Sequence, residues 1–290
     1  MTQGRDRGSE AIDRVTQRWV QATGRRVDLR RHAWLDGPWS EPDLVGSTWV
    51  DREIQRTGGA AAIESDACGL LPRMAELDGE GLHTSALRPE VVDFYERTSA
   101  WHLEAAVRWS PWARPFGLLI RAIFADRLQQ LGLPLRDDEL IGGIDSRVVT
   151  ARAADGTHVG SSWIRTLRST GATIYSGWYG TVTLPGHPRP SVRVVFPLPN
   201  GSVTVFLRPE PGPNGSLLLR SPVGAFGDDG AYLVVRDAVG TGAWVRRIPI
   251  AETFAVFVDA EGALRTRHDL SLRAAHVVRF DYLMSRNTGA

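Results

Sequence analysis

The hydrophobic positions of this chain change their period near residue 140. Before that point, apolar residues recur every three or four positions in several segments, as they do on one face of a helix. After it, they alternate with polar residues in short segments that turn residues separate. The pattern predicts a single domain of the α+β class, in which a mainly helical part, residues 1–140, packs on an antiparallel β part, residues 141–290.

A series of short segments in the second part has the composition of strands. They are rich in Val, Ile, Leu, Thr, Tyr and Trp, and pairs such as Asn200-Gly201, Asn214-Gly215 and Glu261-Gly262 between them favour tight turns. We therefore expect one antiparallel β-barrel or strongly curved sheet of roughly eight or more strands. The expected strands are 145–153, 158–168, 172–184, 191–197, 202–208, 216–221, 231–237, 243–249, 253–259, 263–270 and 276–283.

The first part contains segments with a helical period at 9–20, 49–57, 89–109 and 115–131. The 115–131 helix is expected to lie against the 89–109 helix, or to close one end of the barrel. Residues 66–88 have no clear period and are rich in Gly and Pro. They are interpreted as a loop, and loops beside rigid elements often carry functional residues.

The predicted helix over residues 89–109 carries one acid without an obvious partner. Asp93 and Glu104 each lie four residues before an arginine, the favourable order for an ion pair on a helix. Glu96 has no such neighbour and is flanked by small and apolar residues. Such a carboxylate is either a solvated edge of the helix or a functional group that faces a pocket, and both interpretations stay open.

Composition excludes several kinds of chemistry. All 34 basic residues are arginine, so no lysine can form a Schiff base, anchor pyridoxal phosphate or serve a P-loop. The formal net charge is +1, which argues against a broad surface for nucleic acid. Cys68 is the single cysteine, which excludes an internal disulfide and zinc sites with several cysteines.

The chain shows no signal for a membrane or a metal. Its N-terminus is polar, and its longest apolar stretch, residues 115–125, is interrupted by Arg121 and is too short to span a bilayer. We expect a cytoplasmic protein. The scattered histidines of the β part are interpreted as surface or turn residues, so we expect no metal and no cofactor. These are His158, His187, His268 and His276.

Alternation along two expected strands places an arginine among aromatic residues. Trp163 and Arg165 share one face of their strand, and Tyr175 and Tyr179 share one face of the next. An inward arginine in a barrel needs a carboxylate, either from a ligand or from the protein. We favour the protein, with Asp145 or Glu252 as partner. The chain also has ten tryptophans, which could line a pocket for a flat ligand. A flat aromatic ligand with a carboxylate would therefore suit such a barrel.

The overall plan and one residue order resemble a known enzyme family. The order Arg73, His83, Glu96, with Glu96 in Asp-Phe-Tyr-Glu-Arg-Thr, is similar to that of the bacterial Pictet–Spenglerases, which make β-carboline alkaloid scaffolds. Those proteins have about this size, with a helical first half and a β-rich second half. The chain also looks like a broader group of uncharacterised actinobacterial proteins that share Leu-Arg-Ser-Thr-Gly and Ser-Gly-Trp-Tyr-Gly.

The resemblance implies a cofactor-free condensation of a tryptophan-like amine with an aldehyde to a tetrahydro-β-carboline, in natural-product biosynthesis. The family's glutamate would protonate the carbinolamine and later remove the ring proton, which is general acid–base catalysis. Its arginine would hold the amino-acid carboxylate and its histidine would orient the substrate. Carried over to this sequence, the catalytic residues are Glu96 and His83, and the substrate-binding residues are Arg73, Tyr95, Trp101, Arg165 and Trp178.

Two other functions stay open at this stage. One is a lipocalin-like protein that binds a hydrophobic metabolite without changing it, in which Glu96 is a surface residue and the arginines are structural. The other is a cofactor-free cyclase or isomerase of a polyketide pathway that uses the same pocket and acid. The pocket would lie inside one chain or at the interface of a homodimer.

Overall fold

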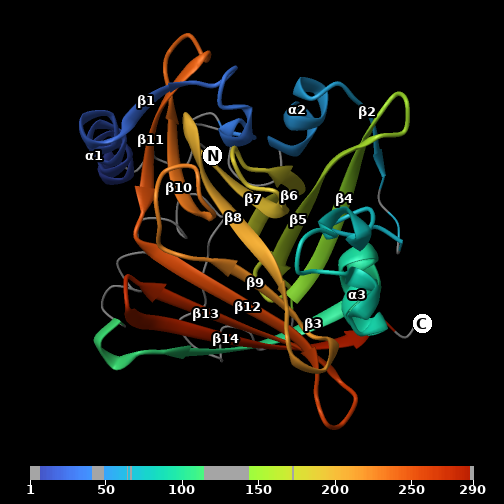
Figure 1. Cartoon of the computed structure of the whole chain (residues 1–290). Helices are drawn as coiled ribbons and strands as arrows, with labels where there is room; N and C mark the ends of the chain where they lie inside the picture. The colour runs from blue at the N-terminus through green and yellow to red at the C-terminus, as the bar shows by residue number, and fades with distance from the viewer. Residues whose placement is uncertain are drawn as a thin grey trace.

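One antiparallel sheet dominates the fold (Figure 1). The computed structural model describes residues 7–40, 49–63, 65, 67–113, 144–171 and 173–287. Its sheet has 14 strands, and the expected antiparallel sheet in the second half of the chain is confirmed. Every segment that the alternation predicted as a strand forms one.

Ten strands of the sheet follow one another around a nearly closed barrel. Each is paired with its neighbours in antiparallel fashion, and the two strands at the ends of the series, β4 and β3, approach each other. In spatial order they are β4 (Ile144–Ala153), β5 (His158–Leu167), β6 (Thr173–Thr183), β7 (Pro190–Leu198), β8 (Gly201–Pro211), β9 (Leu217–Ser221), β12 (Ile250–Val258), β13 (Leu264–Leu272), β14 (Ala275–Arg286) and β3 (Trp101–Trp109). The short β2 (Gly59–Ile63) pairs with the outer edge of β4.

The turn residues have the backbone conformations that the sequence predicts. The hairpin between β7 and β8 has Asn200 in the left-handed region, with φ of 58°, which asparagine tolerates better than most residues. Gly262, between β12 and β13, has φ of 83°, where a residue with a Cβ atom would be strained. Both connections are too short to contain a crossover helix, so the strands that they join are antiparallel.

A branch leaves the barrel at β8. Residues 201–206 of β8 pair with β10 (Gly230–Arg236), whereas residues 208–211 pair with β9. The strand β11 (Gly242–Ile248) pairs with β10 and with β1 (Arg25–Asp28), and the chain then passes through Pro249 into β12. The helix α1 (Arg7–Thr23) packs on β10 and β11, as Figure 1 shows, so it covers the branch.

The predicted helix over residues 89–109 is correct only in its first part. The helix α3 ends at Glu96 (Pro89–Glu96), a short 3-10 turn follows at Thr98–Ala100, and the strand β3 begins at Trp101. The expected ion pair between Asp93 and Arg97 forms. The pair between Glu104 and Arg108 does not, because this stretch is extended, and Arg108 instead contacts Asp281 on β14.

The sequence of β3 fits a strand as well as a helix. Trp101, Leu103 and Val107 occupy alternate positions and are buried, and the pairing with β14 supplies the backbone hydrogen bonds that a helix would have supplied locally. The strand closes the barrel from the first part of the chain. The described α-helices all lie in the first part of the chain, but this part also supplies β1, β2 and β3. The prediction of a mainly helical part packed on the barrel is therefore not confirmed in the residues that the structure describes.

The other three predicted helices have different outcomes. The 9–20 helix is present within α1. The 49–57 helix is present as α2 (Trp49–Arg56), and it ends before Gly58, whose φ is positive. Trp49 packs against the outer side of the barrel next to Trp178. The predicted helix at 115–131 lies outside the described residues.

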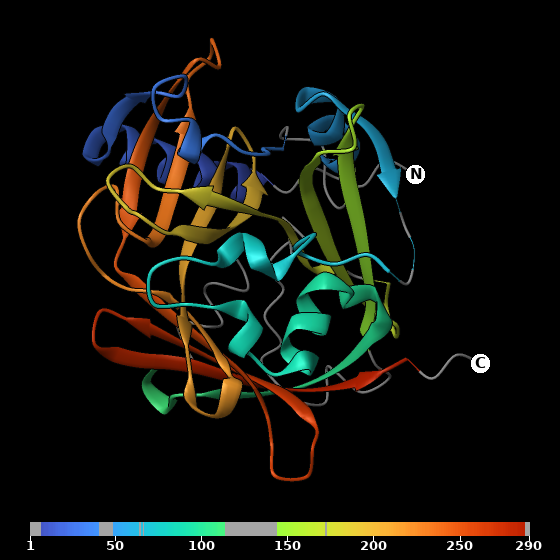
Figure 2. The same ribbon diagram turned by 45° about the vertical axis from the view of Figure 1, so that its right-hand side comes forward.

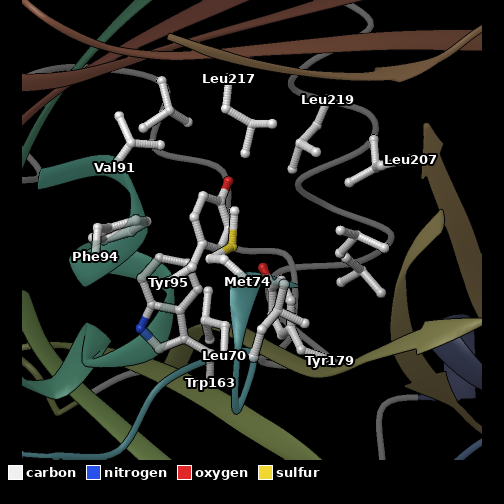
Figure 3. Close-up of a cluster of buried hydrophobic side chains, with 14 of the residues drawn as sticks. Leu70, Met74, Val91, Phe94, Tyr95, Trp163, Tyr179, Leu207, Leu217 and Leu219 are labelled. Atoms are coloured by element: carbon white, nitrogen blue, oxygen red, sulfur yellow. The ribbon is translucent and has the colours of Figure 1, made fainter. Parts of the chain in front are cut away.

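Figure 2 shows α3 and the loop before it lying against the barrel. One large buried cluster of side chains joins them to the inner face of its strands. Figure 3 shows Leu70, Met74 and Phe94 from this segment facing side chains of the strands, among them Trp163 and Leu219. Burial of large apolar side chains at this contact stabilises the fold by roughly 1.5–3 kcal/mol each. The segment from 68 to 96 thus covers one side of the barrel interior.

Gly160 on β5 allows the outer packing of the barrel wall. A Cβ atom at this position would collide with the indole ring of Trp178, which is buried against Trp49. We expect Gly160→Ala to lower the free energy of unfolding by about 1–3 kcal/mol, since overpacking forces the ring or the strand to move. Denaturant unfolding measures this change.

Gly180→Ala is the matched control, because it lies on the neighbouring strand β6 and a Cβ atom there would meet open space. It should stay within about 1 kcal/mol of the parent protein. Equal stability of the two variants would contradict the packing described for β5 and β6.

Candidate functional site

The interior of the barrel holds a cavity of about 270 Å³. Its wall is mostly apolar and comes from α3, the loop before it and nearly every strand of the barrel. Figure 3 shows part of this wall, including Tyr95, Trp163 and Tyr179. Three groups of polar side chains interrupt it: Arg165, the tyrosines around it, and a Glu252–His268 pair.

Arg165 lies on β5 with 8% of its surface exposed. Its guanidinium carbon is 3.7 Å from the ring centre of Trp163, 5.0 Å from that of Tyr175 and 5.3 Å from that of Tyr282. The indole N–H of Trp163 donates a 2.7 Å hydrogen bond to Ser146 Oγ on β4, which fixes the ring beneath the cation. Aromatic faces attract a guanidinium by roughly 0.5–2 kcal/mol each.

The expected carboxylate partner of Arg165 is absent among the described residues. Asp145 instead accepts a 2.6 Å hydrogen bond from Arg168 at the surface, and Glu252 is paired with His268. The prediction that the protein supplies the carboxylate is therefore wrong for both candidates. The Nε atom of Arg165 is buried and has no hydrogen-bond partner.

Two phenols lie beside this cation. The hydroxyls of Tyr175 and Tyr179 on β6 hydrogen-bond to each other. Burial raises the pKa of both phenols, while the positive charge of Arg165 opposes the rise. Burial also raises the pKa of Tyr95, which reaches the cavity from α3. The tyrosines therefore remain neutral hydrogen-bond donors at physiological pH.

The third polar group is a histidine–glutamate pair on neighbouring strands. His268 Nε2 on β13 lies 3.1 Å from Glu252 Oε2 on β12, and their side chains are 13% and 14% exposed. The imidazole stacks on Phe254, at 3.8 Å and 13°, and also on Phe280, at 5.5 Å and 25°. The interpretation of His268 as a surface or turn residue is wrong, because it faces the interior from the middle of a strand.

Of the sequence-predicted site residues, Tyr95 and Arg165 line the cavity. Glu96 does not. It borders a smaller cleft of about 200 Å³ together with Cys68 and Arg152, and its Oε1 accepts a 2.6 Å hydrogen bond from the backbone N–H of Met74. The structure thus separates Glu96 from Arg165 by placing them on different hollows.

The remaining predicted residues also lie away from the cavity lining. Arg73 and His83 are exposed in the loop before α3. Trp101 donates its indole N–H to Asp93 and packs under Arg286. Trp178 alternates with the inward residues of β6, so it packs outside the barrel on Trp49.

Sequence reasoning missed Glu252, His268 and Tyr282. The sequence contains a signal for two of them. Glu252 is two residues from both Ile250 and Phe254, and His268 is two residues from Leu270, so both share the apolar face of their strands. A polar residue in phase with an apolar face is the pattern that had identified Arg165.

Fold and site together define an antiparallel barrel with a small aromatic cavity and an interior cation that has no carboxylate partner among the described residues. The chain is similar to an uncharacterised membrane protein of Bacillus subtilis, YndJ, with 28% identity over 214 residues, which are 72% of this chain and 35% of that protein. It therefore spans about a third of the length of that relative. No family model matches the chain, and no solved structure matches it.

The described residues also bear on a membrane span and a metal site. None of the helices found there has the length and apolar character needed to cross a membrane. In the same part of the chain, no group of three or more His, Cys, Asp or Glu side chains is placed to hold a metal ion.

The buried phenols predict an alkaline loss of stability. Unfolded tyrosines ionise near pH 10, whereas Tyr95, Tyr175 and Tyr179 keep their protons to higher pH in the fold. Above about pH 10 the unfolded chain therefore binds fewer protons than the folded one, and the free energy of unfolding falls as the pH rises. Near-ultraviolet absorbance of the folded protein should show these phenols still protonated at about pH 11.

The same titration in denaturant is the control, and there all five tyrosines of the chain should ionise near pH 10. If every phenol of the folded protein also titrated near pH 10, the burial of Tyr95, Tyr175 and Tyr179 would be wrong.

Proposed function

We propose that this barrel binds a small, largely apolar carboxylic acid. The observation that carries the proposal is Arg165, a buried guanidinium with an unpartnered Nε and no ion pair among the described residues. A buried charge without a counter-ion costs several kcal/mol, and aromatic faces offset only part of this cost. A ligand carboxylate would complete the pairing bidentately.

The rest of the cavity supports a ligand with a flat or short apolar body. Its wall is mostly aliphatic and aromatic, and its volume of about 270 Å³ lies near the lower end of ligand pockets. One of the Tyr175 and Tyr179 hydroxyls donates to the other, and the remaining O–H can donate to a second oxygen of the ligand.

Arg165→Met tests this proposal. The ligand-free variant should be more stable than the parent protein by about 1 kcal/mol or more, because an unpaired buried charge is replaced by an apolar side chain of similar length. At the same time it should lose affinity for indolepropanoic acid or decanoic acid by about 10- to 100-fold, the worth of a charged hydrogen bond. Calorimetry and tryptophan fluorescence measure binding, and denaturant unfolding measures stability.

The matched control is Arg168→Met, which removes an exposed arginine three residues away that pairs with Asp145 at the surface. It should bind the acids normally. The primary amide of each acid is the second control, and Arg165→Met should no longer distinguish acid from amide. Tight binding of the amide by the parent protein, or unchanged binding by Arg165→Met, would refute the proposal.

A Pictet–Spengler condensation is the second candidate that we propose. Its support is the residue order Arg73, His83, Glu96 together with an aromatic cavity that could take an indole and a cation that could take an amino-acid carboxylate. In the form predicted from the resemblance, Glu96 is the general acid and base. Because Glu96 lies on the smaller cleft and not on the aromatic cavity, its catalytic role needs a direct test.

Glu96→Gln supplies that test. The amide keeps an oxygen to accept the Met74 N–H, so the fold should persist, while proton transfer is lost. If Glu96 is catalytic, product formation from L-tryptophan and a panel of aldehydes should fall by about 10² or more, measured by chiral chromatography. Glu104→Gln is the control, since Glu104 is exposed on β3. Full activity of Glu96→Gln would remove Glu96 from the mechanism.

A further inference from the structure

The Glu252–His268 pair is not explained by ligand binding alone. Its groups are mostly buried in an apolar cavity, where a charged or polar pair costs desolvation energy that well-packed apolar residues would not. A second histidine–carboxylate pair on the same sheet, His276 with Asp269, has the same 3.1 Å separation but lies outside the cavity lining and is more exposed. Of these two pairs, the Glu252–His268 pair is the more buried and the one that lines the cavity.

The geometry fixes the orientation of the imidazole. Phe254 and Phe280 stack on His268 from the two flanking strands, and the carboxylate of Glu252 faces Nε2. When Nε2 carries the proton and donates it to this hydrogen bond, Nδ1 holds the free electron pair. Nδ1 has no hydrogen-bond partner among the residues that the structure describes. A carboxylate that orients a histidine in this way makes the other nitrogen a better base.

The pair and the cation belong to one cavity. Both Arg165 and Glu252 lie close enough to the Tyr175 hydroxyl to influence its ionisation, the first favouring and the second opposing the phenolate. A ligand whose carboxylate meets Arg165 therefore has a phenol donor beside it and a base on another part of the same wall. These are the parts needed to remove a proton from carbon and to stabilise the resulting oxyanion.

We infer that Glu252 and His268 move a proton on an oxo carboxylic acid bound at Arg165, so that the barrel is a keto–enol tautomerase. His268 takes a proton from the carbon next to the ketone. The electrons of that C–H bond form a C=C bond, and the carbonyl electrons move to oxygen, where a tyrosine hydroxyl donates to it. Return of the proton to oxygen gives the enol, and its return to carbon restores the ketone. No electron is gained or lost, and no group leaves.

The inference depends on the proposed function, because the base can act only on a ligand that Arg165 holds. The test uses phenylpyruvate, an aryl oxo acid, in heavy water with the 290-residue chain. Exchange of its methylene protons for deuterium is followed by NMR, and binding is measured separately by calorimetry. We expect the parent protein to accelerate exchange by about 10² or more over protein-free buffer.

His268→Gln should reduce exchange by about 10² or more while binding persists, because the amide can still donate to Glu252 but offers no base. A purely structural role would be satisfied by this change. His276→Gln, which alters the matched pair outside the cavity, should exchange like the parent protein. Glu252→Gln, a second variant that keeps an acceptor for Nε2, should lower the exchange rate at saturation with little effect on KM.

The outcomes separate the two proposals. Phenylpyruvate that binds without faster exchange, or equal exchange by His268→Gln and the parent protein, overturns the tautomerase and leaves the binding function standing. Binding of indolepropanoic acid but not of phenylpyruvate also overturns it, because the ligand class is then wrong. If no carboxylic acid binds, the proposed function fails and the tautomerase fails with it.

Discussion

Closure of the antiparallel barrel fixes which side chains reach the interior. Side chains alternate across a strand, so once a strand is paired on both sides, every second residue faces inward whatever its polarity. On β5 this rule brings Arg165 inside with Trp163, and on β12 it brings Glu252 inside with Phe254. The chemistry of the cavity therefore depends on which polar residues occupy inward-facing positions of otherwise apolar strands. Within the described residues, the charged groups that line it all come from strands.

The two interior charges are treated differently by their surroundings. Glu252 has His268 as a partner at hydrogen-bond distance, whereas Arg165 has aromatic faces and no carboxylate within the described chain. Two opposite charges free to meet in an apolar cavity would pair, since attraction is strong where water is scarce. Their separate placement on β5 and β12 keeps the guanidinium available. This arrangement is what distinguishes the cavity from an ordinary packed core.

The strands of the second half were predictable from sequence because both of their signals are local. Alternation and turn pairs such as Asn200-Gly201 need no knowledge of the rest of the fold. The error at residues 101–109 has the opposite cause. Trp101, Leu103 and Val107 suit either period, and the choice is made by pairing with β14, which lies at the other end of the sequence. The pairing of Glu252 with His268 in the site was not predicted for a related reason, because only barrel closure brings them to the same cavity as Arg165.

Glu96 illustrates how a neighbour in sequence can differ in role. Adjacent residues on a helix point about 100° apart, so Tyr95 enters the cavity while Glu96 faces the smaller cleft. Glu96 accepts the Met74 N–H, and Leu71 N–H donates to the Tyr95 carbonyl, so the end of α3 holds the loop that covers the barrel. An effect of Glu96 on ligand chemistry can therefore arise through the position of Leu70 and Tyr95, without contact between its carboxylate and the ligand. The strands supply the charged groups of the cavity, and the end of α3 determines how one side of that cavity is closed.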